Sequence, residues 1–219
     1  MKSVLVTGGT VRIGKAIAER LRAEGWRVIT SSHRADAGAD IVADLAEPRS
    51  AAKLYAATLQ MLGGMPPDAL VNNAALFTGD AAAIKAVNLE APKKLTMLMA
   101  GRETGMGAVV NVLDAAASDS RNSSNSRSSS QAGRGYLDSK RELLSFTRAS
   151  AATFAATLRV NAVAPGPVLA PTDVHEKAGE MLLERRPTAD DVAAAVSYLL
   201  SAEATTGAIL PVDAGQHLL

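Results

Sequence analysis

Residues 6–14 read Val6-Thr7-Gly8-Gly9-Thr10-Val11-Arg12-Ile13-Gly14 and join two segments of different character. The run before them, Ser3–Thr7, is apolar and β-branched, which predicts a buried strand. Residues 14–24 after them have apolar side chains spaced four apart, which predicts a helix. A glycine-rich turn between a strand and a helix N-terminus suits a dinucleotide pyrophosphate. Because many such turns contain glycine for steric reasons alone, the rest of the chain must support this interpretation.

Length and composition limit the possible classes of protein. The 219 residues suit one α/β domain, so we expect a single domain over residues 1–219. A formal net charge of +1 gives no reason to expect nucleic acid or an anionic membrane as a partner. The lack of cysteine excludes disulfides and thiolate metal sites. No signal peptide fits before Ser3 and no apolar run approaches the roughly 20 residues that span a bilayer, so we expect a cytoplasmic protein.

Short apolar runs alternate with helical patterns along the chain. The alternation predicts an α/β fold, a Rossmann-like doubly wound sheet of seven mostly parallel strands with helices on both faces. Ligands of such sheets bind beyond the carboxyl ends of the strands. Pro48 and Thr188 are expected to mark helix starts, the latter in a capping box with Asp191. The expected strands are Ser3–Thr7, Arg27–Ser31, Asp40–Ala43, Ala69–Asn72, Ala108–Leu113, Leu158–Val163 and Ala208–Val212, and the expected helices are 14–24, 48–62, 81–101, 136–156 and 188–201.

One segment interrupts this alternation. Residues 118–135 read SDSRNSSNSRSSSQAGRG and contain no aliphatic side chain larger than alanine. Such a composition buries too little apolar surface to offset its ordering entropy, so we expect a flexible loop over residues 115–135. The loop is either an inert insertion or a lid whose arginines face an anionic ligand.

The residues after the second strand bear on the choice of cofactor. His33 and Arg34 stand there, and residues 30–35 contain no acid. A carboxylate at this point would repel the 2′-phosphate of NADP, whereas a guanidinium pairs with it. The sequence therefore favours NADP(H), although His33 and Arg34 could also be ordinary solvated loop residues.

Two further strand ends carry weaker signals for the same cofactor. Asp44 and Leu45 follow the third strand and suit the edge and the face of an adenine ring. Asn72 and the small residue Ala74 follow the fourth strand. Small residues let the backbone approach the ribose and nicotinamide, and Asn72 can tie neighbouring strand ends together. Each signal gains weight because it falls at a strand end.

The strongest chemical signal is the pair Tyr136 and Lys140. On a helix these two positions share a face. An ammonium near a phenol stabilises the phenolate, so we expect Lys140 to lower the pKa of Tyr136 from about 10. The phenol then becomes a usable proton donor or acceptor. By chance the same spacing can be an exposed helical pair.

Together these residues resemble the short-chain dehydrogenase/reductase family over nearly the whole chain. The matching segments are residues 7–14, Asp44-Leu45, 72–75, Asn88 within 87–92, Tyr136 with Lys140, 161–166 and 206–213. The resemblance implies a doubly wound sheet of seven parallel strands. It also implies a homotetramer or homodimer that acts on a small-molecule substrate.

The resemblance implies a role for each matching residue. Tyr136 would be the acid/base, Lys140 would hold the nicotinamide ribose, and Asn88 would support a proton-relay water. Thr172 would reach the carboxamide or the pyrophosphate. The further cofactor-binding residues that it implies are Gly8, Thr10, Arg12, Ile13, Gly14, Pro165, Gly166 and Val168.

The chain departs from the family at the end of the fifth strand, where the family usually carries a catalytic serine. Asp114 stands there, as in the pteridine and dihydrofolate reductases of the family, which also carry an arginine like Arg12 and a His-Arg pair like 33–34. A pterin imine needs a proton at nitrogen, which an Asp–Tyr pair can relay. Ser118 is an alternative to Asp114. Asp114 and Tyr136 lie 22 positions apart, compared with about a dozen in relatives, so the substrate pocket is expected to differ from that of relatives.

The sequence therefore predicts an NADPH-dependent reductase of a pterin or dihydrofolate-like substrate, with Asp114, Tyr136, Lys140 and Asn88 as the catalytic set. One alternative is a carbonyl reductase, of the 3-oxoacyl type, and another is an NADP(H)-binding sensor without turnover. No metal is expected, because His33, His175 and His217 are scattered along the chain.

Overall fold

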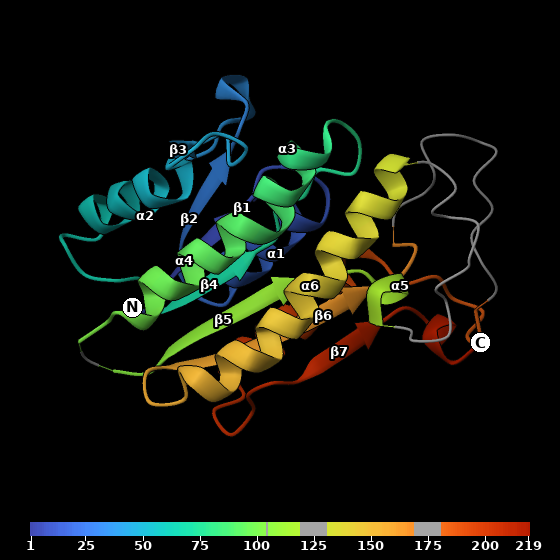
Figure 1. Ribbon diagram of the computed structural model, residues 1–219. Helices are drawn as coiled ribbons and strands as arrows, with labels where there is room; N and C mark the ends of the chain where they lie inside the picture. The colour runs from blue at the N-terminus through green and yellow to red at the C-terminus, as the bar shows by residue number, and fades with distance from the viewer. Residues whose placement is uncertain (104, 119–130, 169–180) are drawn as a thin grey trace.

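A computed structural model describes residues 1–103, 105–118, 131–168 and 181–219 (Figure 1). Seven strands form one sheet in the order β3-β2-β1-β4-β5-β6-β7, and every neighbouring pair is parallel. This confirms the predicted fold class and the seven predicted strands. The strands are β1 (Ser3–Thr7), β2 (Arg27–Ser32), β3 (Ile41–Val42), β4 (Ala69–Asn72), β5 (Gly107–Val112), β6 (Leu158–Pro165) and β7 (Ile209–Val212).

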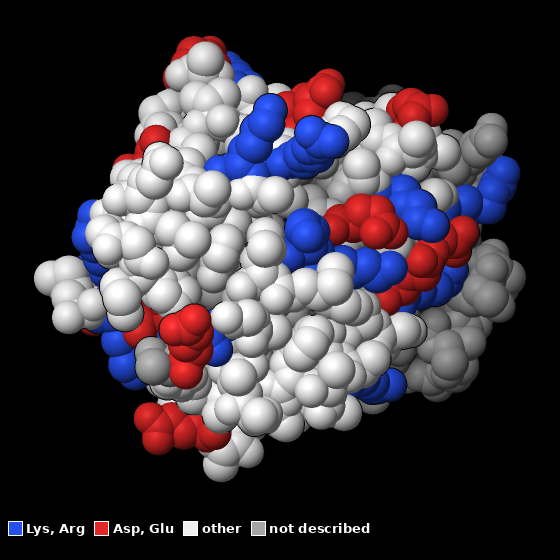
Figure 2. Space-filling view, turned by 60° about the vertical axis from the view of Figure 1, so that its left-hand side comes forward, with Lys and Arg blue, Asp and Glu red and all other residues white. Residues whose placement is uncertain are grey.

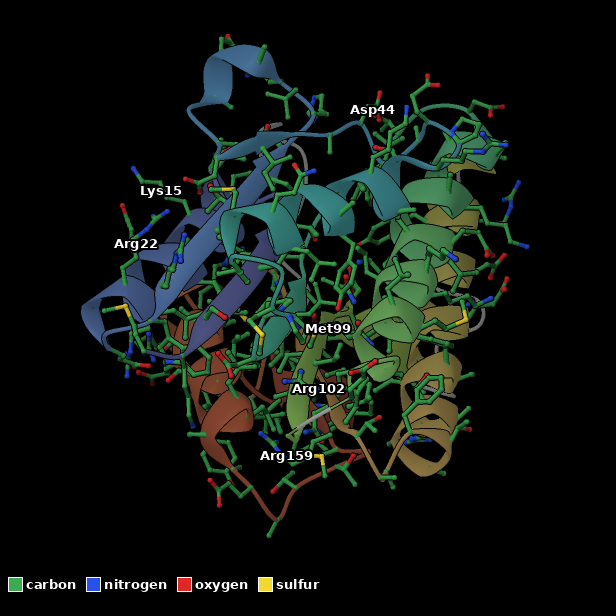
Figure 3. All side chains as sticks on the ribbon, turned by 90° about the vertical axis from the view of Figure 1, so that its left-hand side faces the viewer. Lys15, Arg22, Asp44, Met99, Arg102 and Arg159 are labelled. Carbon is green, nitrogen blue, oxygen red and sulfur yellow. The ribbon has the colours of Figure 1, made fainter. Side chains whose placement is uncertain are left out.

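Helices cover both faces of the sheet. The α-helices are α1 (Arg12–Ala23), α2 (Ser50–Met61), α3 (Ala81–Lys85), α4 (Ala91–Ala100), α5 (Ala115–Ser118), α6 (Gln131–Thr153) and α7 (Ala189–Ser201). Short turns of 3-10 helix lie at Ala35–Ala37 and Gln216–Leu218, the latter labelled η4. Helices α1 and α7 pack on one face, and α2, α4 and α6 pack on the other, so the sheet lies between two helical layers (Figure 3).

Successive side chains of each strand pack alternately against the two helical layers. Val4 and Val6 of β1 face the cluster that contains α1 and α7, whereas Leu5 between them faces the cluster that contains α2 and α4. Because successive side chains of a strand point to opposite faces, a strand that is buried on both faces reads as a continuous apolar run. All five residues of β1 are buried, as the sequence indicates.

The expected helix over residues 81–101 is in fact three pieces. Helix α3 begins at the N-cap Asp80, whose carboxylate accepts hydrogen bonds from two backbone N–H groups. A π-helical turn, Ala86–Glu90, then leads into α4. Pro92 in the first turn of α4 has no N–H to donate, so the regular ladder cannot run through it. Single π-turns of this kind are frequent at functional sites.

Several helix ends differ from the sequence prediction. Helix α2 begins at Ser50, two residues after Pro48, and α6 begins at Gln131 instead of at residue 136. The predicted loop over residues 115–135 is therefore wrong at both ends, because 115–118 and 131–135 are helical. Residues 119–130 lie outside the described part of the chain. The predicted capping box of Thr188 and Asp191 is confirmed.

Charged side chains of both signs are mixed on the face shown in Figure 2, in keeping with the net charge of +1. Within the described ranges, no helix combines the length and apolarity required to cross a membrane.

Candidate active site

The carboxyl ends of the strands meet at one edge of the sheet, because all the strands are parallel (Figure 1). The glycine turn after β1, the residues after β4, Asp114 after β5 and the end of β6 all lie at this edge. Helix α6 brings Tyr136 and Lys140 to it from the side. The side chains at this edge are therefore the candidate site residues, because ligands of parallel sheets bind beyond the carboxyl ends of the strands.

The glycine turn is held in one tight shape. Gly8 has a φ of +63°, which favours glycine, and a Cβ on Gly14 would collide with the carbonyl oxygen of Gly8. The side-chain amide of Asn73 donates to the carbonyl oxygens of Thr7 and Gly8, both at 3.0 Å. The hydroxyl oxygen of Thr7 in turn accepts from the backbone N–H groups of Asn73 and Ala74, at 3.0 Å each. The end of β4 thus fixes the turn after β1.

This turn fits a pyrophosphate. Helix α1 starts directly after it, and no side chain caps its N-terminus, where Val11 is the N-cap residue. The first N–H groups of an α-helix and its positive dipole end are suited to an anion. Arg12 adopts a φ of +51°, which costs about 1 kcal/mol for a residue with a Cβ, and its side chain is exposed. Thr10 and Ile13 are partly exposed beside it.

The predicted 2′-phosphate residues lie in solvent after β2. His33 and Arg34 are both exposed. The guanidinium of Arg34 makes two hydrogen bonds to the carboxylate of Asp36, at 3.0 and 2.7 Å. These hydrogen bonds raise the pKa of Arg34 and lower that of Asp36. Residues 30–35 contain no acid, yet the next residue provides one, so Arg34 is paired in this structure.

Asp44 and Leu45 take different environments after β3. Asp44 is exposed, and its Oδ1 accepts a hydrogen bond from the N–H of Ala46 at 2.9 Å. Leu45 is buried in the core cluster beneath α2 and α4. Asp44 follows the edge strand β3, whereas Asp114 follows β5, with β2, β1 and β4 between these two strands. We call the part of the site around Asp114 and Tyr136 the reaction end.

A buried chain of polar side chains crosses from the sheet to α6. Asn72 donates its amide to Asn111 at 2.8 Å, and Asn111 donates to the hydroxyl of Thr147 at 2.9 Å. Thr147 completes the chain by donating to the carbonyl oxygen of Leu143. Asn72 therefore ties two strand ends together, as the sequence predicts. The positions of Asn111 and Thr147 were not singled out from the sequence.

Asp114 and Tyr136 meet at the reaction end. Oδ1 of Asp114 accepts from the N–H of Ala116 at 2.9 Å, in the first turn of α5. Its Oδ2 accepts from the hydroxyl of Tyr136 at 3.1 Å. A backbone N–H thus binds one oxygen of the carboxylate, and the Tyr136 hydroxyl binds the other. The side chain of Ser118, the alternative to Asp114, lies outside the described residues.

The electrostatics of this pair correct one prediction. Burial, together with the charge and the hydrogen bond of Asp114, raises the pKa of Tyr136 well above its usual value. Burial lowers the pKa of Lys140 to about 8, although Asp114 counteracts that shift. The Lys140 ammonium lies 5.7 Å from the centre of the Tyr136 ring and donates to the carbonyl oxygen of Val112 at 2.8 Å. The expected lowering of the Tyr136 pKa by Lys140 is therefore wrong here, and the phenol is protonated near neutral pH.

Asn88 lies fully buried in the π-turn and connects two elements of the site. Its side chain accepts from the N–H of Leu76 at 2.7 Å and donates to the Leu76 carbonyl oxygen at 2.9 Å. It also donates to the hydroxyl of Ser139 at 3.1 Å, and that hydroxyl donates to the Tyr136 carbonyl oxygen at 2.6 Å. Both amide hydrogens are used inside the protein, so the side chain serves to hold the loop after β4 against α6.

Phe77 is a site residue that the sequence analysis missed. Its ring lies 4.8 Å from the Tyr136 ring, centre to centre, and is tilted by 59°. The side chain is 56% exposed, which is unusual for an aromatic residue beside a polar site. Its position shortly after β4 could have identified it, because the analysis already treated strand ends as candidates.

The residues predicted to border the nicotinamide lie at the end of β6 and just after it. Pro165 and Val168 are buried there, and the N–H of Gly166 donates to the carbonyl oxygen of Val212 at 3.0 Å. A Cβ on Gly166 would lie 2.6 Å from that of Asp213, so only glycine allows this approach. Thr172 and His175 lie outside the described residues. Within the described ranges, no three His, Asp or Glu side chains gather as metal ligands.

The chain matches known proteins over almost its full length. A family model described as enoyl-(acyl carrier protein) reductase matches residues 10–217. Protein FixR of Bradyrhizobium diazoefficiens is 32% identical, over 99% of this chain and 87% of that protein. A Streptomyces violaceoruber protein named as a ketoacyl reductase of granaticin polyketide synthase is 32% identical, over 98% of this chain and 96% of its own length.

A solved structure is also similar to this chain over its full length. The alternative dihydrofolate reductase 1 from Brucella canis, crystallised with NADP, superposes with a TM-score of 0.83 at 32% identity, over 100% of this chain and 95% of that chain. Together with the family match and the two sequence relatives, it agrees with the fold described above. The chain therefore belongs to the short-chain dehydrogenase/reductase family of oxidoreductases.

Proposed function

We propose that this protein reduces a pterin or dihydrofolate-like substrate with NADPH. The observation that carries the proposal is the hydrogen bond between Tyr136 and Asp114, at the end of β5. Tyr136, Lys140 and Asp114 are the proposed catalytic residues, and Asn88 is proposed to hold the loop that borders them.

The carboxylate favours a nitrogen substrate over a carbonyl. Reduction of a ketone builds negative charge on oxygen, which the nearby charge of Asp114 would repel. Reduction of an imine is helped by protonation of its nitrogen, and the resulting cation is attracted to the same carboxylate. The neutral Tyr136 phenol can give that proton, and the Lys140 ammonium then lies close enough to offset the phenolate charge.

Phe77 supports a flat substrate. Its exposed ring stands next to the Tyr136 ring and offers an apolar face at the reaction end of the site. Aromatic rings pair in offset or tilted arrangements with a gain of about 0.5–1.5 kcal/mol beyond burial. A pterin ring can use this face, whereas a small aliphatic ketone gains much less from it.

The cofactor assignment has two supports. The turn after β1 has the closed shape and the uncapped helix N-terminus that suit a pyrophosphate, with Arg12 beside it. The related dihydrofolate reductase of Brucella canis was crystallised with NADP. NADPH supplies a hydride when bound. His33 and Arg34 are proposed to hold its 2′-phosphate, and Pro165, Gly166 and Val168 are proposed to border its nicotinamide.

A carbonyl reductase of the 3-oxoacyl type is the second candidate. Tyr136 with Lys140 provides the neutral hydroxyl that a carbonyl oxygen needs, and the related Streptomyces violaceoruber protein is named as a ketoacyl reductase. The two candidates differ at Asp114. Replacement by serine should preserve or improve carbonyl reduction, because it removes the repelling charge, but should impair pterin reduction.

The test measures oxidation of NADPH with dihydrobiopterin, dihydrofolate and 3-oxoacyl thioesters, with NADH as the cofactor control. Turnover with a dihydropterin that is lost in Asp114→Ser supports the proposal. Turnover with 3-oxo compounds alone supports the second candidate. NADPH binding without turnover of any compound would contradict both and favour a cofactor-binding sensor. Light scattering of the same preparation tests the proposed homodimer or homotetramer.

A further inference from the structure

Asp213 organises the last turn of the chain. Its side chain is 3% exposed and follows directly after β7. Oδ1 accepts from the N–H of Gly215 at 3.0 Å, and Oδ2 accepts from the N–H of His217 at 2.8 Å. Nδ1 of the His217 ring lies 2.9 Å from Oδ2. Because a buried carboxylate needs hydrogen-bond partners, these donors fix the shape of residues 213–217.

The turn connects separate segments of the chain. The carbonyl oxygen of Ala214 accepts from the N–H groups of Leu182 and Leu183, at 3.0 and 3.1 Å. Asp213 itself packs against Gly166 at the end of β6. The following 3-10 turn, η4, contacts α5, and Figure 1 shows the C-terminal end of the chain on the side of the molecule where α5 lies.

Helix α5 decides where the Asp114 carboxylate points. Asp114 is bound to the first turn of this helix twice, through its Oδ1 to the N–H of Ala116 and through its carbonyl oxygen to the N–H of Ala117, at 2.9 and 3.0 Å. These bonds leave Oδ2 directed at the Tyr136 hydroxyl. Helix α5 has only four residues, so its own hydrogen bonds hold it weakly and its packing partners decide its position.

We propose that Asp213 and His217 form a positioning pair that seats η4 against α5 and thereby holds Oδ2 of Asp114 on the Tyr136 hydroxyl. The two residues act through α5, so they are positioning residues and not catalytic ones. The effect on turnover rests on the proposed function, whereas the effect on the Asp114–Tyr136 geometry does not.

The geometric test uses nuclear magnetic resonance of protein labelled with ¹³C at Cζ of tyrosine. The chain has three tyrosines, and Tyr136→Phe assigns the signal of interest. Asp114→Asn gives the signal expected when the carboxylate charge is lost. His217→Ala should move the Tyr136 signal at least half of the way toward that position and lower the pH at which it titrates. His217→Asn should keep the native signal, because its amide N–H replaces the ring N–H.

Two further variants complete the geometric test. Leu219→Ala is the matched control, since this exposed side chain lies in the same terminal turn and should leave the Tyr136 signal unchanged. If His217→Ala does not fold, His217→Leu retains bulk without the hydrogen-bond donor. An unchanged Tyr136 signal in the folded alanine or leucine variant would overturn the proposal.

The kinetic test is a double-mutant cycle. His217→Ala should lower kcat about tenfold and leave the KM for NADPH within twofold. In the Asp114→Asn background the same change should have no further effect, because the two changes act on one contact. A full tenfold loss in that background would overturn the proposal. If no substrate turns over, the proposed function fails, and the resonance experiment still decides on the positioning pair.

Discussion

The hydroxyl of Tyr136 donates a hydrogen bond to Oδ2 of Asp114 at 3.1 Å, although the two residues lie 22 positions apart in the chain. Tyr136 lies in the second turn of α6, and Asp114 follows the end of β5. Because burial and the neighbouring charge of Asp114 raise the pKa of Tyr136, the phenol stays protonated near neutral pH. Most of the chemical behaviour expected of this site follows from that contact.

Replacement of Asp114 by asparagine should separate the charge of the carboxylate from its shape. The amide keeps a hydrogen-bonding group beside Tyr136 but removes the negative charge that raises the pKa of the phenol. We expect kcat for a dihydropterin to fall about 100-fold, within the range of a lost acid–base group. Stopped-flow kinetics and NADPH titration would measure this. An equal loss in NADPH affinity would show that Asp114 supports the cofactor instead of the substrate.

The pH dependence of the reaction should report Lys140. Burial lowers the pKa of this lysine to about 8, so its ammonium is lost as the pH rises through 8. We expect kcat/KM to fall above that pH, because the ammonium offsets the phenolate charge and holds the ribose in the proposed mechanism. The profile of the native enzyme from pH 6 to 10 gives the inflection.

The Asp114→Asn variant supplies the control for this profile. The charge of Asp114 raises the pKa of Lys140 against the effect of burial. Its removal should therefore shift the inflection to a lower pH, whereas a simple loss of activity would leave the inflection in place. An inflection that stays in place, or moves upward, would exclude Lys140 as the titrating group.

Phe77 should affect the KM of flat substrates more than that of small ones. Phe77→Ala removes the exposed ring beside Tyr136 and should raise the KM for a dihydropterin about tenfold, equivalent to roughly 1.4 kcal/mol. Phe77→Tyr keeps the aromatic face and serves as the matched control. Steady-state kinetics with both variants decide the matter. A loss that is confined to kcat would instead indicate that the ring only supports Tyr136.

The sequence predicted the sheet because its strands are buried on both faces and read as continuous apolar runs. Ser3–Thr7 and Ala69–Asn72 have the predicted bounds for this reason. Helix ends were harder to predict, because they depend on contacts distant in sequence. The start of α6 at Gln131 lies within a polar segment whose composition favours a loop.

Some features of the candidate site were predicted correctly from the sequence, and others were not. Tyr136 and Lys140 were predicted from their types and spacing, and Asp114 from the resemblance to the family, and the structure brings the three together. The direction of the Tyr136 pKa was not predicted correctly, because it depends on burial and on distances that a spacing pattern does not contain. Phe77 was missed because an exposed aromatic residue in a loop has no periodic signal.

The pairing of Arg34 with Asp36 leads to a prediction on cofactor choice. Asp36 occupies Nε and Nη2 of the Arg34 guanidinium, one of the two edges with which it could bind a 2′-phosphate, and its carboxylate adds a repelling charge. Asp36→Ala should therefore strengthen NADPH binding several-fold and leave NADH binding unchanged, because NADH lacks that phosphate. Arg34→Ala should weaken NADPH binding by a similar or larger factor. Fluorescence titration of both cofactors tests each variant.

The double variant Arg34→Ala/Asp36→Ala provides the control for this reasoning. Without the guanidinium, removal of the carboxylate takes away only a distant repulsion, so NADPH affinity should lie close to that of Arg34→Ala alone. The pair is exposed, and the gain in Asp36→Ala should shrink as salt is raised from about 50 to about 500 mM, since salt screens exposed charges. An Asp36→Ala variant that binds NADPH less tightly would mean that Asp36 orients Arg34 toward the phosphate instead of competing with it.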